Sequence, residues 1–221
     1  MSRKAGTRAV PRSSTQSAGL PPTAKGRATR ERILAATRSA LEDLGPGRLN
    51  VSEIVSRAET SRANFYKHFQ DLADILLELA EAPMAELVRL AETERPPGGS
   101  MTVSDVQAWM RATLEVRDEH AVVLRAVQEI VEAGDAARAI LRWERWREAA
   151  HAQAREWIRE ARVAHEIDDP IPLDDMTETL IEAIETLRRR RRRQAAGFLD
   201  GEALDRLAHD VAVVAIRLVR P

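Results

Sequence analysis

The chain has 221 residues, 44% of them hydrophobic, with no cysteine and a formal net charge of −1. This composition can fill one large or two small hydrophobic cores, and it excludes disulfides and thiolate metal sites. No stretch approaches the roughly 20 uncharged apolar residues of a membrane-spanning helix, so we expect no membrane contact and a cytoplasmic location.

The small net charge results from two parts of opposite sign. Residues 1–70 contain 13 Lys and Arg against 5 Asp and Glu, whereas residues 71–221 contain 21 against 30. A basic N-terminal part on an acidic body is typical of a nucleic-acid binder whose body stays away from the polyanion. The alternative is a solvated cationic tail beside an ordinary acidic domain.

Helical periodicity dominates after Gly26, and no sustained alternation predicts a strand. Residues 1–26 are rich in Ser, Thr, Pro, Gly and Arg, and we expect them to form a disordered basic tail. Pro83 predicts a kink in the fourth helix, or an end and a restart before Met84. The fold class is therefore all-α, with helices at about 27–44, 51–58, 61–67, from 71 onward, 103–117, 120–133, 135–165, 173–196 and 202–219.

The second and third helices, joined by a tight turn, form a helix-turn-helix. Asn50 and Ser61 are the expected N-caps, and Glu53 occupies the capping-box position after Asn50. Phe65 and Phe69 are four residues apart, so both point into the core. The opposite face of the third helix is then available for a DNA major groove.

The polar residues of the third helix match the chemistry of a DNA duplex. Arg62 can read a guanine edge and Asn64 an adenine edge. Tyr66, Lys67 and His68 suit phosphates, which set register rather than sequence. The basic residues at the start of the first helix are expected to contact the DNA backbone, while the tail before them either tracks phosphates or is only solvated. The predicted DNA-contacting set is Lys25, Arg27, Arg30, Ser52, Ser61, Arg62, Ala63, Asn64, Tyr66, Lys67 and His68.

The run from Ile54 to Phe69, which reads IVSRAETSRANFYKHF, resembles the N-terminal domain of TetR-family regulators, and Arg30–Thr37 is similar to that family's first helix. The resemblance covers about residues 27–80. It implies a helix-turn-helix DNA-binding domain over 27–70 and a helical ligand-binding and dimerisation domain over 71–221. It also implies a homodimeric repressor that a small molecule releases from a palindromic operator. Glu59 stands where the family commonly has Gly, at a cost of about 1–2 kcal/mol if that position is left-handed.

Four tryptophans are candidates for the walls of a ligand pocket. Three share the long seventh helix, and the body's layout is similar to regulators of the ethionamide-activation type, which bind elongated apolar ligands. The alternative is ordinary core packing, since tryptophan serves both purposes. The predicted ligand-binding set is Trp109, Met110, Leu114, Trp143, Trp146, Trp157 and Met176.

The last two helices are the expected dimer seam. In the final helix Leu204, Leu207, Val211, Val214, Ala215 and Leu218 repeat at spacings of three and four, which favours either a four-helix bundle across a two-fold axis or burial within the monomer. The run Arg188–Arg193 suggests inter-helix ion pairs on a solvated face, an anion site or salt bridges across the seam.

No catalytic constellation, phosphate loop or metal-ligand cluster is visible, so we expect neither an enzyme nor a cofactor or metal. A second hypothesis is a helical scaffold that binds a protein partner and uses its basic head on DNA without sequence preference.

Overall fold

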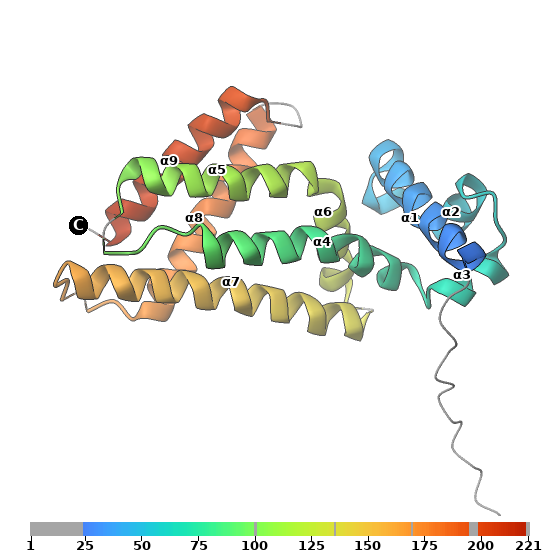
Figure 1. Ribbon diagram of the computed structural model, residues 1–221, viewed down its shortest axis with the longest axis horizontal. Coiled ribbons are helices and arrows are strands. Elements are labelled where there is room, and N and C mark those ends of the chain that lie inside the picture. The colour runs from blue at the N-terminus through green and yellow to red at the C-terminus, as the bar shows by residue number, and fades with distance from the viewer. Residues whose placement is uncertain (1–23, 100, 135, 169, 195–198, 220–221) are drawn as a thin grey trace, which may run out of the picture.

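The computed structural model describes residues 24–99, 101–134, 136–168, 170–194 and 199–219. Over these residues the chain forms nine α-helices, a short 3-10 helix and no strand (Figure 1). The number and the order of the helices confirm the all-α prediction. The α-helices are α1 (Ala24–Leu44), α2 (Val51–Arg57), α3 (Arg62–His68), α4 (Leu72–Thr93), α5 (Val103–Glu119), α6 (Ala121–Ala133), α7 (Ala137–Ala164), α8 (Leu173–Gln194) and α9 (Gly201–Val219), and η1 (Pro46–Arg48) is the 3-10 helix.

The first helix begins earlier than predicted. Its first turn includes residues 24–26, which the sequence assigned to the disordered tail, and Thr29 Oγ1 donates to the Lys25 carbonyl oxygen within this turn. Residues 1–23 of the predicted tail lie outside the described part of the chain.

Helix α4 continues through Pro83, so the predicted alternative of an end and a restart before Met84 is wrong. Proline inside a helix removes one backbone hydrogen bond and costs roughly 3 kcal/mol. Apolar side chains on both sides of Pro83 are buried, among them Leu76, Leu79 and Leu90. Their packing outweighs the local cost, since burying one large apolar side chain contributes about 1.5–3 kcal/mol.

The buried apolar side chains form two clusters. The first joins α1, α2 and α3 to α4 and α6, with Ile33, Phe65 and Val127 among its members. The second lies among α5, α7, α8 and α9, around Trp157 and Leu207. In Figure 1 the three-helix head lies at one end, with α4 running from it into the body. The head therefore shares a hydrophobic core with α4 and α6 across the boundary expected at residue 70.

The final helix is buried largely by its own chain. Leu207 and Val211 have no exposed surface, and Ala215 is 3% exposed, because α9 packs along α5 and α8. The spacing of three and four residues therefore reflects burial within the chain, which was the second of the two alternatives predicted from the sequence. Val214 and Leu218 are half-buried.

Candidate nucleic-acid interface

A left-handed residue turns the chain between α2 and α3. Glu59 has φ of 47°, and its N–H donates to the Ser56 carbonyl oxygen (3.2 Å) while the N–H of Thr60 donates to that of Val55 (3.0 Å). This pair of bonds is the Schellman arrangement that ends a helix, usually with Gly at the left-handed position. The sequence implied strain here only if the residue is left-handed, and the structure shows that it is.

Side-chain caps start each helix of the motif. Asn50 Oδ1 accepts the N–H of Glu53 (3.0 Å), and Ser61 Oγ accepts that of Asn64 (3.1 Å), as predicted. The Glu53 carboxylate does not complete a capping box. It accepts from Arg57 Nε at 2.7 Å, and Arg57 also pairs with Asp43 of α1. Arg57 therefore ties α2 to α1 and braces the motif.

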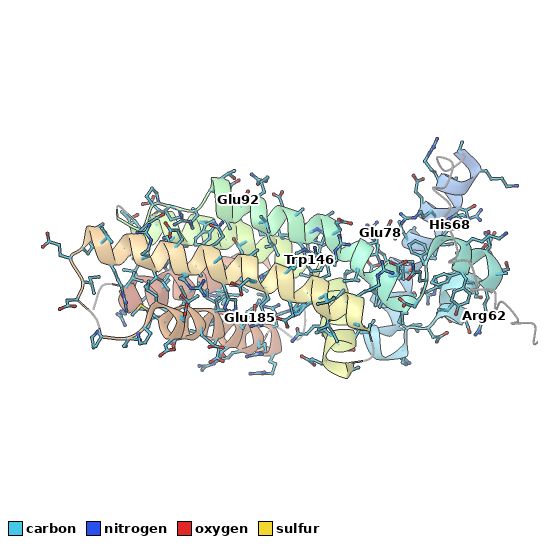
Figure 2. All side chains as sticks on the ribbon, turned by 90° about the horizontal axis from the view of Figure 1, so that it is seen from below. Arg62, His68, Glu78, Glu92, Trp146 and Glu185 are labelled. Carbon is cyan, nitrogen blue, oxygen red and sulfur yellow. The ribbon has the colours of Figure 1, made fainter. Side chains whose placement is uncertain are left out.

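Two phenylalanines fix the orientation of α3. Phe65 is fully buried and Phe69 is 2% exposed, with ring centres 5.6 Å apart. Tyr66 packs edge-on against Phe65 and is nevertheless 53% exposed. The predicted inward face is thus confirmed, and Figure 2 shows Arg62 at the outer end of the head, away from the body.

Most of the predicted DNA-contacting residues are exposed, on α2 and α3 and at the start of α1. A guanidinium N–H of Arg62 donates to Ser52 Oγ, which connects the first turns of α3 and α2. Tyr66 and Lys67 follow on the same helix. The exposed members of the predicted set are Lys25, Arg27, Ser52, Ser61, Arg62, Ala63, Tyr66 and Lys67.

Three predicted contact residues are engaged within the protein or are only partly exposed. Asn64 Nδ2 donates to Thr60 Oγ1 (2.8 Å), and His68 is half-buried. Arg30 forms an ion pair with Glu78 of α4 and lies 4.9 Å from the centre of the Phe69 ring. DNA contacts by these three stay predictions. The ion pair was missed because the sequence does not reveal that residues 30 and 78 face each other.

The predicted ligand-binding residues divide between the two clusters. Trp157 is 1% exposed and donates to the Pro96 carbonyl oxygen (3.1 Å). Trp109 lies beside it, with ring centres 6.3 Å apart, and Met110, Leu114 and Met176 belong to the same second cluster. Trp143 and Trp146 pack against the first cluster, nearer the head. The seven residues therefore belong to two hydrophobic clusters rather than one.

Trp109 alone of these seven lines a described cleft. The cleft, about 370 Å³ in volume, also has Glu94, Pro96, Pro97, Asp105 and Ala108 in its wall. A second cleft of about 270 Å³ lies between α5, α8 and α9 and is lined mostly by charged residues. Neither cleft is lined by more than one of the tryptophans, and their role as walls of a ligand pocket stays a prediction.

The run Arg188–Arg193 forms inter-helix ion pairs, which was the first of the three alternatives predicted from the sequence. Arg191 pairs with Asp210 of α9 (2.5 Å), and Arg192 with Asp118 of α5 (3.3 Å). Arg188 pairs with Glu185 one turn earlier (2.7 Å). Arg190 and Arg193 are exposed. The run thus holds α8 against α5 and α9.

Residues 33–79 match the family described as bacterial regulatory proteins, tetR family. No curated protein matches the chain. Among the helices of the described ranges, none has the length and apolar character needed to cross a membrane.

Solved structures of regulators share the fold over most of the chain. A TetR-family protein from Rhodococcus RHA1 has a TM-score of 0.66 at 15% identity, covering 86% of this chain and 96% of its own. A putative TetR-family regulator from Syntrophomonas wolfei has a TM-score of 0.60 at 16% identity, covering 86% and 96%. SmeT, the repressor of the Stenotrophomonas maltophilia multidrug efflux pump SmeDEF, has a TM-score of 0.59 at 18% identity, covering 87% and 90%.

Proposed function

We propose that this chain, which belongs to the TetR family of bacterial regulatory proteins, is a dimeric repressor released from its operator by a small ligand. The observation that carries the proposal is the orientation of α3. Its two phenylalanines are buried, whereas Arg62, Tyr66 and Lys67 are exposed on the opposite face. A short helix held in this way presents side chains that suit base edges and phosphates of a major groove.

A ligand-responsive body is supported by one of the structural relatives. SmeT has been solved in complex with triclosan, at 20% identity to this chain and a TM-score of 0.59. By analogy, we assign effector binding to the body of this chain, beyond residue 70.

Helix α4 is the proposed lever between body and head. It begins at Leu72, four residues after the end of α3, and ends at Thr93, and its first half packs in the cluster that also contains the head. Arg138 and Arg142 at the start of α7 pair with Asp74 (3.7 Å) and Glu81 (2.5 Å) of α4. A ligand with unequal affinity for two positions of α4 would shift the population of the DNA-binding state.

Dimerisation through α8 and α9 remains part of the proposal, but through their outer faces, because much of α9 is already buried. Val213 is half-buried on the side of α9 opposite Val211. A two-fold axis there would place two recognition helices on successive major grooves about 34 Å apart. We expect Val213→Asp to weaken the dimer in sedimentation experiments, while Val163→Asp, on a side chain 69% exposed in α7, leaves it unchanged. Equal sedimentation of both variants and the wild type would place the seam elsewhere.

A footprint on the intergenic DNA next to the gene tests the function itself. The full chain should protect a palindromic site with two half-sites, and excess unrelated DNA should not remove the protection. The scaffold alternative predicts binding to all sequences alike, with loss of protection when competitor DNA is added. Uniform binding would therefore overturn the repressor proposal.

A further inference from the structure

Five charged residues gather inside the body where α5 and α8 meet, away from the proposed DNA face. We call them the α5–α8 charged cluster: Arg117, Asp118, Glu185, Arg188 and Arg192. We propose that this cluster binds the acidic group of the effector, so that the ligand is an amphipathic organic anion. This inference rests on the proposed ligand-responsive function, and it names the ligand's chemical class and the residues that bind it.

Two arginines share one carboxylate in the cluster. Arg117 Nη1 lies 2.7 Å from Glu185 Oε1, and Arg188 donates to Glu185 Oε2 from Nη2 (2.7 Å) and Nε (3.1 Å). The cluster thus contains three guanidinium groups and two carboxylates. Each guanidinium carries five N–H donors, and the one carboxylate that Arg117 and Arg188 share cannot accept from all the donors of two guanidinium groups. The two arginines can therefore bind a further anion.

The guanidinium groups are enclosed by protein without being sealed off. Burial lowers the pKa of Arg117, the charge of Glu185 partly offsets this effect, and the neighbouring charge of Arg188 lowers the pKa further. Even so, 32% of the Arg117 side chain and 20% of the Arg188 side chain are accessible. Burial also lowers the pKa of Arg192, against the opposing charge of Asp118 and with a smaller contribution from Arg188 in the same direction as burial. Crowded, partly desolvated cations are stabilised by an anion, and the interaction is stronger there than at an exposed surface.

Apolar side chains lie next to the cluster. Leu114 is one helical turn before Arg117 and is 2% exposed, and Ile184, beside Glu185, packs against the second hydrophobic cluster. Figure 2 shows Glu185 in the body, away from the head. An acidic group at the arginines would therefore lie beside the partly exposed side chain of Ile184, whereas Leu114 belongs to the buried core. The hydrocarbon part of the ligand would contact Ile184 and reach Leu114 only if the core side chains moved.

The cluster is also close to the part of the body that contacts the head. One residue, His120, separates the end of α5 from the start of α6, and α6 packs against η1 and α1. A ligand that moves Arg117 acts three residues before this junction. Binding at the cluster can therefore change the position of the head without contact between ligand and head.

Calorimetry on the full chain without DNA tests the site directly. The probes are octanoate, octyl phosphate and octanol, which share a hydrocarbon chain and differ in the acidic group. We expect both anions to bind more tightly than octanol, and the tighter of the two identifies the acid as a carboxylate or a phosphate. Octanol binding as tightly as both anions would overturn the proposal.

Substitutions in the cluster should change octanoate affinity in opposite directions. Arg117→Gln and Arg188→Gln each remove a charged donor and should weaken binding roughly ten- to hundred-fold. Glu185→Gln removes the competing carboxylate and should tighten binding. Arg190→Gln makes the same charge change at an exposed position of α8 and should leave the affinity unchanged. A purely structural cluster would give losses in all three cluster variants, or no change in any, and either result contradicts an anion site.

The outcomes separate this inference from the proposed function. Circular dichroism identifies variants that fail to fold. If Arg188→Gln does not fold, Arg188→Lys replaces it, because lysine keeps the charge and lacks the planar guanidinium. We then expect an intermediate loss of octanoate affinity. A normal footprint with no anion binding leaves the repressor proposal intact and removes the anion site. Anion binding with the expected variant pattern but no footprint leaves the anion site intact and removes the repressor proposal.

Discussion

Arg30 of α1 forms an ion pair with Glu78 of α4, and its guanidinium lies 4.9 Å from the centre of the Phe69 ring. The contact connects the first helix of the head to the proposed lever helix. Glu78 lies between the head and the body in Figure 2. This geometry favours a role for Arg30 in positioning the head rather than in direct phosphate contact.

Paired substitutions distinguish these two roles of Arg30. If Arg30 only positions the head, Arg30→Gln and Glu78→Gln should both lower the free energy of unfolding by at most about 1 kcal/mol, since both side chains are partly exposed. Neither should change the salt slope of operator binding. A phosphate contact would instead lower that slope by about 0.9 in Arg30→Gln alone. Denaturant unfolding and a salt series of gel shifts provide the two readouts.

The strained turn before α3 predicts a stabilising substitution. Glu59→Gly removes the Cβ that disfavours the left-handed backbone, while Gly adds entropy to the unfolded chain. The net gain should be about 0.5–1 kcal/mol in the free energy of unfolding, measured with urea. Glu59→Ala keeps the Cβ and should show no such gain. A similar gain in both variants would mean that the charge of Glu59, rather than its backbone, is unfavourable.

Two substitutions on α3 should affect DNA binding differently. Arg62→Ala should reduce discrimination against mismatched operators by about 1–3 kcal/mol, because a guanidinium can read a guanine edge. Lys67→Ala should weaken binding to all sequences alike and lower the salt slope by about 0.9. Titrations against the operator and against single-base variants measure both effects. Uniform loss of affinity in both proteins would contradict the base-reading role of Arg62.

The loop between α4 and α5 lies closely against α7, and Gly98 makes that approach possible. A Cβ at this residue would come within 2.6 Å of the Trp157 carbonyl oxygen and 2.7 Å of the Ala161 nitrogen. Both atoms belong to the α7 backbone and cannot move independently of the helix. Gly98→Ala should therefore lower the free energy of unfolding by about 1–3 kcal/mol.

Gly47→Ala is the matched control for this prediction, because nothing lies within 4 Å of its Cβ position. The thermal midpoint of Gly47→Ala should stay close to that of the wild type, and that of Gly98→Ala should fall. Equal midpoints for the two variants would show that the loop moves away from α7 at little cost.

The elements that the sequence predicted well depend on contacts between residues close in the chain. Helix periodicity, the caps Asn50 and Ser61 and the inward side of Phe65 arise within a few residues. The Glu59 backbone was also foreseeable, because a helix that stops and restarts within four residues commonly has a left-handed residue at its end.

Other features depended on which helices meet, and the sequence left them open or gave the wrong answer. Helix α4 continues past Pro83 because neighbouring helices bury its apolar residues. The tryptophans of α7 divide between two clusters because the helix is long enough to reach both.

By itself, then, the sequence determined an all-helical chain with a basic head and the face that α3 turns outward, since helical period and charge are properties of neighbouring residues. Only the tertiary structure decided which charges meet, as when Arg117 and Arg188 share Glu185. Partners 68 residues apart are brought together by the packing of whole helices, and no local pattern records that packing.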